Sequence, residues 1–360
     1  MSEIGIGLVG YGLAGRVFHK PLIEATPGLR LRAIMTRSEE KQAQAREENP
    51  DALVLDDFDR LCALDEVDLV VLATPHDVHC EQAIAALAAG RGVVVDKIMA
   101  RSVAEADAMI AAAERHRQLL TVFHNRRWDS DWLTVLSALE RGLLGEVWSV
   151  DIAVVRPVMP LAPLGAERRW RARREAFGGQ LVDWGAHLMD QAVLLAGSQP
   201  AEVFCDLQFR QSGNDNDTEA FVALRYRSGL RLTITTSVQT WLTKPHWFIS
   251  GSEGTLVIEG IDPQESVTAR TGRVVGGTDE ACLSPEAVHL TSSVPAPDFG
   301  PIPGDWRQFY VNVRDSLLGS AEPIVTPAHC RDVLRLYERC FGAVGRDNPT
   351  TSDRPAGLLS

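Results

Sequence analysis

The sequence lacks any closely spaced pair of cysteines. Its six cysteines are scattered singly along the chain, as Cys62, Cys80, Cys205, Cys282, Cys330 and Cys340. A disulfide framework or a structural zinc site needs clustered or regularly spaced cysteines, so we expect reduced, mostly buried thiols and no bound metal. Reduced thiols are typical of a reducing compartment, and we therefore predict a cytoplasmic protein.

The chain also lacks an excess of basic residues. It has 36 Lys and Arg against 48 Asp and Glu, which gives a formal net charge of −12 with histidines neutral. No run of basic residues forms a stripe that could neutralise the phosphates along a duplex. We therefore expect no nucleic acid partner.

Long hydrophobic runs are absent as well. No segment reaches the roughly 18 uninterrupted apolar residues that a membrane-spanning helix needs. The first residues, MSEIGIGLVG, have neither the basic start nor the long apolar stretch of an export signal. The sequence therefore predicts neither export nor a membrane partner.

The apolar residues that are present suffice for two domains. Of the 360 residues, 45% are hydrophobic, enough to bury sizeable cores without disulfide or metal support. In the first third, short β-branched runs alternate with alanine-rich amphipathic stretches, the pattern of parallel strands joined by crossover helices. Six strands are expected at residues 4–9, 29–35, 53–55, 68–73, 92–95 and 119–123, with helices such as 81–89 and 104–115 between them. This count predicts a doubly wound, Rossmann-type parallel sheet.

The pattern changes after a predicted linking helix at residues 129–141. Alternating strands are expected at 146–155, 201–209, 219–226 and 231–238, with helices at 179–195, 305–318 and 327–341 and a proline-rich connection at 294–303. Ser228-Gly229 separates two alternating runs and predicts a hairpin, so this second sheet should be mainly antiparallel. We therefore predict an α/β protein with a dinucleotide-binding domain at 1–124, an α+β domain at 125–345 and a mobile tail at 346–360.

A glycine-rich segment directly follows the first strand and opens a helix. It reads Gly10-Tyr11-Gly12-Leu13-Ala14-Gly15, a G-x-G-x-x-G pattern whose small residues allow a sharp turn and let the helix N-terminus face a pyrophosphate. The alternative is a glycine-rich turn in another α/β fold. Because the segment lies in a strand-turn-helix context ahead of five more strands, we interpret it as a dinucleotide site.

The end of the second strand bears on the choice of cofactor. A site that prefers NAD usually carries an acidic residue there for the ribose hydroxyls, whereas this chain has Thr36-Arg37-Ser38. A guanidinium with two neighbouring hydroxyls suits a 2′-phosphate. We therefore predict NADP as the preferred cofactor, with NAD as the other possibility; the alternative is that Arg37 is a solvated surface residue.

Polar motifs follow three more of the predicted strands. Thr74-Pro75-His76 follows the fourth, Asp96-Lys97 the fifth and His124-Asn125-Arg126-Arg127 the sixth. Ligands of open parallel sheets bind beyond the carboxyl ends of the strands. We therefore expect these motifs to share one edge of the sheet with the glycine segment.

Lys97 comes directly after a buried run of valines, where an unpaired ammonium would be costly. One interpretation is a lysine that contacts the cofactor ribose and the reacting hydroxyl. The other is a lysine that extends to the surface and pairs with Asp96. Both remain open from the sequence alone.

In the second domain, Asp183 and His187 stand four residues apart and so share one face of a predicted helix. A histidine near its ordinary pKa suits the role of general base in alcohol oxidation, because the hydroxyl proton must leave as hydride moves to a nicotinamide. The alternative is a contact on the helix surface. Two ligand types without a third nearby argue against a metal site.

Taken together, these motifs resemble the glucose-fructose oxidoreductase and inositol dehydrogenase (Gfo/Idh/MocA) family over nearly the whole chain. That family shows a glycine fingerprint, a TPxxxH segment, an E/D-K-P motif and a GGxxxDxGxH motif, which match residues 10–15, 74–79, 96–98 and 178–187. The runs GYGLAGRVFHKPLI and VFHNRRWDSDWL look especially like its NADP-linked scyllo-inositol dehydrogenase branch.

The resemblance implies a catalytic set of Lys97, Asp183 and His187, with His187 as acid and base. It also implies a Rossmann domain followed by a domain whose open sheet face commonly mediates oligomerisation, so we expect a homodimer or homotetramer. The residues expected at the cofactor are Gly10, Gly12, Leu13, Ala14, Gly15, Thr36, Arg37, Ser38, Thr74, Pro75, His76, His79, Asp96, Lys97 and Asn125. One position departs from the family: Ile98 replaces the proline after the lysine. A Lys-Ile bond prefers trans, so either that bond is trans or strain is retained at the site.

The substrate wall is predicted from side chains that can hold polyhydroxylated rings. The candidates are His124, Arg126, Arg127, Arg156, Trp170 and Arg171, together with Asp183 and His187. Five arginines lie within residues 168–174, a run that could attract an acidic sugar or form a solvated face. Each of these arginines could equally be structural.

These observations lead to one expected function and two alternatives. We expect an NADP-preferring dehydrogenase or reductase that acts on a secondary hydroxyl or ketone of a sugar or cyclitol. One alternative is a glycosidase that uses a tightly held NAD(H) for transient oxidation, as some relatives of the family do. The other is a nucleotide-sensing regulator with a disabled active site.

Overall fold

The computed structural model describes residues 3–156, 177–209 and 216–344. It divides into two compact units. Unit 1 contains the chain up to Leu136 with Ile261–Pro285 and Gly300–Leu334, and unit 2 contains Ser137–Gly260, Glu286–Phe299 and the chain from Arg335 onward. Unit 1 therefore includes two late segments that the expected continuous division at residue 124 placed in the other domain. The expected tail at 346–360 lies outside the described residues.

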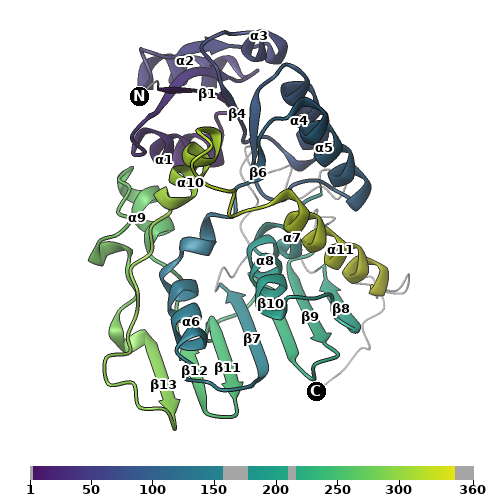
Figure 1. The fold of residues 1–360 in the computed structure, drawn as a ribbon, viewed down its shortest axis with the longest axis vertical. Coiled ribbons are helices and arrows are strands. Elements are labelled where there is room, and N and C mark those ends of the chain that lie inside the picture. The colour runs from purple at the N-terminus through teal and green to yellow at the C-terminus, as the bar shows by residue number, and fades with distance from the viewer. Residues whose placement is uncertain (1–2, 157–176, 210–215, 345–360) are drawn as a thin grey trace, which may run out of the picture. The chain divides into compact units, whose positions relative to one another are not determined.

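Six parallel strands form the sheet of unit 1, in the order β3-β2-β1-β4-β5-β6 (Figure 1). They are β1 (Ile4–Val9), β2 (Leu29–Met35), β3 (Leu53–Leu55), β4 (Leu69–Leu72), β5 (Gly92–Val95) and β6 (Leu120–Val122). This is the strand order of the Rossmann fold. The order of the strands along the chain reverses between β1 and β4, although all six strands run parallel. The predicted doubly wound sheet is confirmed, and its fourth and sixth strands are one residue shorter at each end than expected.

Helices cover this sheet and explain why its central strands are apolar throughout. Every residue of β1, β4 and β5 is buried, as expected for strands with helices on both faces. The helices early in the chain are η1 (Ala14–His19), α1 (Lys20–Glu24), α2 (Glu39–Glu48), α3 (Phe58–Cys62), α4 (His79–Ala88) and α5 (Val103–His116), with short turns η2 (His76–Val78) and η3 (Asn125–Trp128).

Two further helices of unit 1 come from much later in the chain. They are α9 (Gln264–Thr271) and α10 (Arg307–Leu317), and α10 lies against α1 (Figure 1). Specific hydrogen bonds attach these late segments to the sheet. Thr121 Oγ1 donates to the Val325 carbonyl at 2.8 Å, and Arg314 Nη1 donates to the Pro27 carbonyl at 2.9 Å.

Unit 2 is built on a seven-stranded sheet with the order β13-β12-β11-β7-β10-β9-β8. The strands are β7 (Val147–Val155), β8 (Glu202–Gln208), β9 (Glu219–Arg225), β10 (Arg231–Ser237), β11 (Trp247–Gly251), β12 (Gly254–Ile258) and β13 (Val288–Ser292). All neighbouring pairs are antiparallel except β7 and β10. The predicted mainly antiparallel sheet and the β9–β10 hairpin are confirmed, whereas β11, β12 and β13 were not predicted.

One face of this sheet packs against α7 (Gln180–Asp183) and α8 (Gly185–Ala196), which contact β9 and β10. The opposite face we call the open face. Pairing across β8, β9, β10, β7 and β11 places Phe204, Phe221 and Phe248 together on it, with 58%, 37% and 40% of their surfaces exposed. Two more helices, α6 (Ser130–Glu140) and α11 (Pro327–Ala343), begin in unit 1 and end in unit 2.

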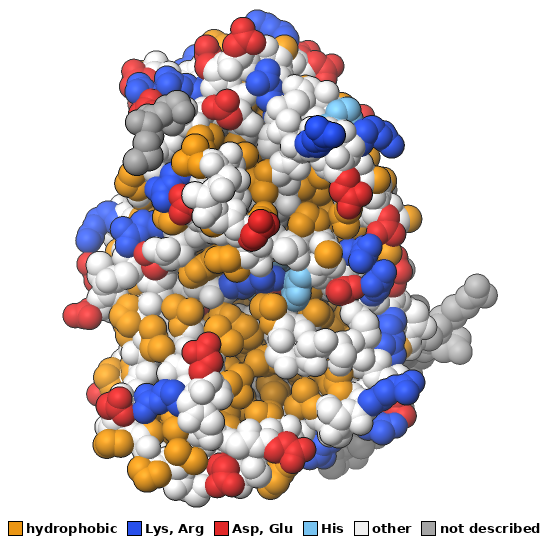
Figure 2. Space-filling view, viewed as in Figure 1, with side chains coloured by type: hydrophobic (Ala, Val, Ile, Leu, Met, Phe, Trp, Pro, Cys, Tyr) orange, Lys and Arg blue, Asp and Glu red, His pale blue; other side chains and the backbone are white. Residues whose placement is uncertain are grey.

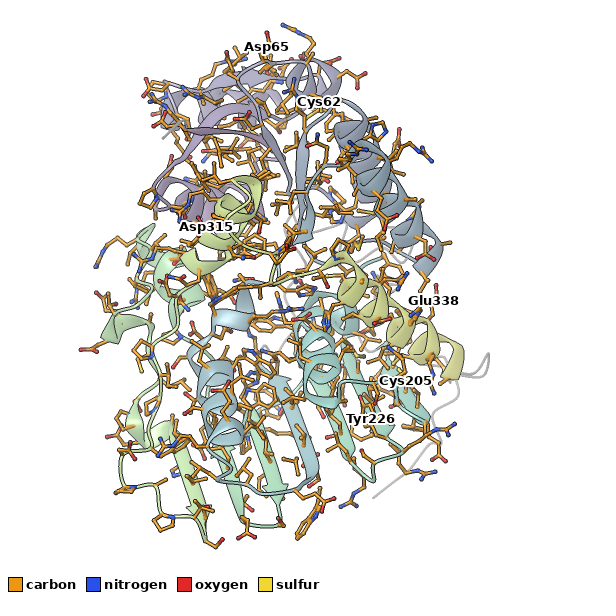
Figure 3. All side chains as sticks on the ribbon, viewed as in Figure 1. Cys62, Asp65, Cys205, Tyr226, Asp315 and Glu338 are labelled. Atoms are coloured by element: carbon orange, nitrogen blue, oxygen red, sulfur yellow. The ribbon has the colours of Figure 1, made fainter. Side chains whose placement is uncertain are left out.

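All six cysteines lie in the described part of the chain, and all six are free thiols. Four are buried, and burial raises the pKa of Cys62 to about 11. Cys205 on β8 and Tyr226 after β9 lie near each other beside Cys340 of α11 (Figure 3). A hydrogen bond with Cys205, together with burial, raises the pKa of Cys340. Their raised pKa values make Cys62 and Cys340 poor nucleophiles, which indicates packing roles for these two thiols.

Three broader features complete the description. Acidic and basic side chains are interspersed on the face of the molecule in Figure 2. Within the described ranges, no helix combines the length and the hydropathy that crossing a bilayer requires. The same ranges hold no cluster of three or more His, Cys, Asp or Glu arranged to bind a metal.

Candidate active site

The turn after β1 depends on glycine at two positions. Gly10 has φ +99°, and a Cβ there would come within 2.3 Å of the Ala73 carbonyl oxygen. A Cβ on Gly15 would lie 2.0 Å from the Gly10 carbonyl oxygen. Any larger residue would push the first helix and the loop after β4 away from β1. The first and third glycines of the fingerprint therefore set the close packing at the end of β1.

The middle glycine of the fingerprint faces open space. The single described atom within 4 Å of a Cβ built on Gly12 is Nζ of Lys41, at 3.7 Å. An open backbone beside a lysine amine, at the start of a helix, is what a pyrophosphate or ribose phosphate requires. The turn therefore fits a dinucleotide, and Lys41 is a site residue that the sequence reasoning missed.

A polar network supports this turn from the side of α2. Tyr11 donates to Glu48 Oε2 at 2.7 Å and accepts from Asn49 Nδ2 at 2.8 Å, while Arg16 Nη2 donates to Glu48 Oε1 at 2.7 Å. The Arg16 hydrogen bond outweighs desolvation and lowers the pKa of Glu48 to about 2. Glu48 therefore stays ionised and ties the end of α2 to the fingerprint.

The residues after β2 divide between structural and accessible roles. Thr36 is buried, and its carbonyl accepts from Gln42 Nε2 at 2.9 Å. Ser38 caps α2, because its Oγ accepts from the Lys41 amide at 3.4 Å. Arg37 is exposed. The Thr36 carbonyl and the Ser38 hydroxyl therefore shape the start of α2, and Arg37 and Lys41 supply the positive charge near the turn.

Two histidines hold the backbone around Lys97. His76 Nε2 donates to the Lys97 carbonyl at 3.0 Å, and His79 Nδ1 lies 2.9 Å from the Ile98 carbonyl oxygen. His79 Nε2 lies 2.9 Å from the Thr74 carbonyl oxygen. Burial lowers the pKa of His79, and this ring joins the loop after β4 to the loop after β5. The Lys97-Ile98 peptide bond is cis.

Asp96 anchors the same turn from the other side. Its Oδ1 accepts from the Lys97 amide at 2.8 Å, and its own amide donates to the Leu72 carbonyl at 2.8 Å. Burial acts to raise the pKa of Asp96, but His19, Lys97 and His79 outweigh burial and hold that pKa well below its usual range. The carboxylate therefore carries its charge, and three separate side chains hold the backbone of Lys97 and Ile98.

The motif after β6 is buried, and one of its side chains bonds a later segment of the chain. His124, Asn125 and Arg127 are all buried, and Arg127 Nη1 donates to the Ile324 carbonyl at 3.1 Å. Among the cofactor candidates after β4, Thr74 Oγ1 donates to Gln82 Oε1 at 2.9 Å. These contacts assign structural duties to Thr74 and Arg127 that the sequence could not show.

Arg126, a predicted substrate residue, lies in a buried ion network. Its guanidinium donates to Asp129 Oδ2 at 2.9 Å and also pairs with Glu265 of α9. Trp306 Nε1 donates to Asp129 Oδ1 at 2.5 Å, and the Arg126 guanidinium lies over the Trp306 ring at 5.5 Å. These partners give Arg126 a role in attaching α9 and the start of α10 to unit 1.

In unit 2, the start of α7 explains the paired glycines before Asp183. Gly179 has φ +107°, and a Cβ on it would lie 2.0 Å from Asp217 Oδ1. The Asp217 carboxylate occupies that space because its Oδ2 accepts from the Leu181 amide at 2.7 Å. Asp217 therefore caps α7, and only glycine fits beside it.

Asp183 and His187 lie on consecutive helical turns, as predicted. Asp183 ends α7 and His187 follows the start of α8, with Trp184 between the two helices in right-handed helical conformation. The His187 amide donates to the Trp184 carbonyl at 3.1 Å. His187 is buried and Asp183 is half-buried. The helix expected at 179–195 is thus divided at Trp184, but the four-residue spacing still places both side chains on one side.

Trp184 and Arg156 extend this group. The Arg156 guanidinium lies 4.1 Å from the centre of the Trp184 ring, and that ring meets the His187 ring edge-on with centroids 6.3 Å apart. A guanidinium over an indole face is a favourable cation–π contact. Trp184 was not predicted as a site residue. Its position between Asp183 and His187 was the one sequence signal that could have indicated it. The candidates Trp170 and Arg171 lie outside the described residues.

In each unit, several of the predicted residues lie close together. In unit 1, the motifs after β1, β2, β4, β5 and β6 share the carboxyl edge of the sheet, because all six strands are parallel. In unit 2, Asp183, His187 and Arg156 surround Trp184. A dinucleotide turn with a fixed lysine backbone in one unit, and a carboxylate and an imidazole on consecutive helical turns in the other, are the components of a nicotinamide-dependent oxidoreductase.

Comparison with known families agrees. The oxidoreductase family profile with the NAD-binding Rossmann fold matches residues 4–124, and the GFO/IDH/MocA C-terminal domain matches residues 132–257. This chain belongs to the Gfo/Idh/MocA family of NAD(P)-binding oxidoreductases.

Several relatives resemble the chain over nearly its full length. The oxidoreductase YdgJ of Escherichia coli K12 is 32% identical, covering 94% of this chain and 95% of its own. The scyllo-inositol 2-dehydrogenase (NADP(+)) IolW of Bacillus subtilis is 27% identical, covering 94% and 93%. Among solved structures, YvaA of Bacillus subtilis has a TM-score of 0.86 at 27% identity, covering 95% of this chain and 96% of its own.

Proposed function

We propose that this protein is an NADP-preferring dehydrogenase or reductase that acts on a secondary hydroxyl or ketone of a sugar or cyclitol. The observation that carries the proposal is the fixed backbone of Lys97, held by His76, His79 and Asp96 at the carboxyl end of β5. An enzyme gains from holding a reacting group in a narrow range of positions, because the orientation need not be found during the reaction. The likeness to a scyllo-inositol 2-dehydrogenase supports the substrate class.

A nicotinamide cofactor would accept or supply the hydride when bound, and the chain's own residues bind that cofactor and transfer the protons. The turn at Gly10–Gly15 holds the pyrophosphate, and Arg37 with Lys41 holds the 2′-phosphate. Lys97 Nζ donates a hydrogen bond to the substrate oxygen and stabilises negative charge on it. The His187 imidazole takes the hydroxyl proton during oxidation and returns it during reduction, with Asp183 orienting the ring or the substrate.

A substrate screen tests this function. Cyclitols, aldoses and anhydrosugars are offered with NADP and with NAD, and the absorbance of the reduced nicotinamide is followed. We expect turnover of at least one cyclitol or sugar, with a higher kcat/KM for NADP. Glycoside cleavage without net cofactor reduction would favour the glycosidase, and nucleotide binding without any turnover would favour a regulator.

Variants of Lys97 and His187 test the mechanism more directly. Lys97→Met and His187→Asn should each lower kcat by about two orders of magnitude or more, as expected for loss of a positioned acid-base or charge-stabilising group. Lys20→Met and His116→Asn are matched controls outside the site, since Lys20 pairs with Glu24 at the surface and His116 ends α5. Near-normal kcat in both site variants would refute the mechanism.

We also infer that a second copy of this chain covers the open face. Three phenylalanines exposed on one face of a sheet are costly in water, and a symmetric partner buries the same face on both copies. Phe204 and Phe221 already pack together, with ring centroids 6.2 Å apart. A homodimer is the simplest assembly that protects them.

A further inference from the structure

We propose that His19 and Tyr310 are positioning residues that hold the Asp96 carboxylate behind Lys97, and through it fix the backbone that carries the Lys97 amine. The inference rests on the proposed function, because it concerns how Lys97 is placed for that reaction. Neither residue is among the predicted site residues, and Tyr310 follows His19 by 291 positions in the chain.

His19 is completely buried, and an unusual turn directs it inward. It ends η1, a widened π-type turn in which the Lys20 amide donates to the Gly15 carbonyl, five residues back. Such turns are rare and often occur at functional sites. The ring stacks at a tilt on Phe123, with centroids 4.1 Å apart. This turn starts in the glycine fingerprint, so His19 is placed by the same segment that shapes the cofactor turn.

The His19 ring joins a hydroxyl to a carboxylate. Nδ1 lies 2.7 Å from the Tyr310 hydroxyl, and Nε2 lies 3.8 Å from Asp96 Oδ1. The second distance exceeds that of a direct hydrogen bond, yet attraction between a ring N–H and a buried carboxylate is strong at this range. Within the described residues, no other group forms a hydrogen bond with Nε2.

The Asp96 carboxylate fixes which atoms donate and which accept between Asp96, His19 and Tyr310. A carboxylate accepts and cannot donate, so the ring proton belongs on Nε2, facing Asp96. Nδ1 is then an acceptor, and the Tyr310 hydroxyl donates to it. Burial and the nearby Asp96 raise the pKa of Tyr310, which keeps its hydroxyl protonated for that purpose.

The effect reaches Lys97 through the backbone. Asp96 Oδ1, the atom that faces His19, also accepts from the Lys97 amide at 2.8 Å. The other titratable groups around Asp96 are the Lys97 amine on the same loop and His79 on α4. Removing His19 leaves a buried carboxylate with less compensation, and such a group becomes protonated at higher pH. A protonated Asp96 holds the Lys97 turn less tightly.

The first arm of the test needs neither cofactor nor substrate. Thermal unfolding midpoints are measured for the full chain with His19→Leu, Asp96→Asn and both. We expect the two losses not to add, because each substitution removes the same interaction. Strictly additive losses would overturn the inference, even if the protein proves to be an active dehydrogenase.

The second arm measures kcat against pH with the substrate found in the screen. His19→Leu should move the acidic limb of the profile to higher pH by about one unit or more, while high pH restores activity. His19→Gln keeps an amide donor and should move the limb less. Tyr310→Phe removes one hydroxyl and should move it in the same direction. In the Asp96→Asn background, His19→Leu should add no shift.

A packing control separates positioning from general damage. Phe309 packs on Phe123 at 5.0 Å between ring centroids and forms no part of the chain to Asp96. Phe309→Leu should leave the acidic limb in place, whatever it does to the unfolding midpoint. Equal losses of kcat at every pH in His19→Leu would contradict the positioning role. A wild-type protein that turns over no sugar or cyclitol would instead remove the proposed function and leave the first arm to decide the contact.

Discussion

The Nζ atom of Lys41 lies 3.7 Å from the point that a Cβ atom on Gly12 would occupy. Lys41 stands in the first turn of α2, three residues after the capping serine, Ser38. The amine of α2 and the open backbone of the fingerprint therefore face the same space. That space is where a phosphate on the adenosine ribose would be recognised in the proposed function.

Removing the Lys41 charge should weaken NADP more than NAD. A hydrogen bond to a charged group contributes about 1.5 to 3 kcal/mol, so Lys41→Gln should lower kcat/KM for NADP by roughly tenfold or more and change that for NAD much less. Steady-state kinetics with both cofactors measure the ratio. Lys20→Gln is the control, and equal losses with both cofactors would refute a role in 2′-phosphate recognition.

Gly179→Ala should destabilise the protein markedly. The residue has φ +107° and ψ 163°, a conformation almost restricted to glycine that costs about 1 to 3 kcal/mol for other residues, and its Cβ would collide with Asp217. We expect a loss of about 3 kcal/mol or more in the free energy of unfolding. Gly197 ends α8 at φ +60° with no described atom within 4 Å, so Gly197→Ala should cost only about 1 to 2 kcal/mol. Similar losses from both substitutions would show that the Asp217 contact is unimportant.

Asp262 should make stability depend on pH. Burial, with Asp131 nearby, raises the pKa of Asp262 to about 6 in the folded protein, against about 3.9 in the unfolded chain. The folded state therefore keeps this proton to higher pH, and the stability that it provides is lost as pH rises from about 4 to about 6, by about 3 kcal/mol. Denaturant unfolding of wild type and Asp262→Asn across this range measures the effect.

The amide that Asp262→Asn introduces cannot ionise, so this variant should lack that part of the decline. The exposed Asp65, labelled in Figure 3, supplies the control. Asp65→Asn should leave the pH dependence of wild type unchanged. Parallel curves for wild type and Asp262→Asn would contradict the raised pKa.

A charge on the open face should dissociate the proposed dimer. Phe248→Asp places a carboxylate beside Asp151, its pairing partner on β7, in a surface that the second copy would bury. Light scattering after size exclusion should show the mass fall to that of one chain. Leu242→Asp changes a more exposed residue outside the sheet and should leave the mass unchanged. A wild-type protein that is already a monomer would refute the proposed dimer.

The sheet of unit 1 was predictable because its strands are buried on both faces. Such strands read as short continuous apolar runs, and each is followed by a polar motif at the same edge. Lys97 and the glycine fingerprint could be found in this way, since the chemistry and the end of a strand coincide in sequence.

Strands β11 and β12 of the second sheet were missed because each is short and only partly buried. Strands β11 and β12 each contain five residues and are joined by Ser252 and Glu253 alone. Neither strand therefore contains an alternating run long enough to predict it. Helix α9 is mostly polar, and it is held by contacts such as that between Glu265 and Arg126, which are 139 residues apart. Partners this distant leave no local signal, which is why Arg126 was expected at the substrate.

Asp183 and His187 were predictable from spacing, whereas their surroundings were not. The capping carboxylate, Asp217, and the stacked Arg156 both come from other segments of the chain. Sequence patterns report which residue types recur together, but the choice of a partner across the fold depends on packing.

The late helix α10 also bears on how the protein is made. The nucleotide module begins at the first strand, yet Tyr310, Arg314 and Val325 complete it by bonding to His19, Pro27 and Thr121. During synthesis the ribosome delivers the opening residues long before these closing ones. These three contacts can therefore form only after almost the entire polypeptide has emerged. Until then the early segments of the nucleotide module remain without them.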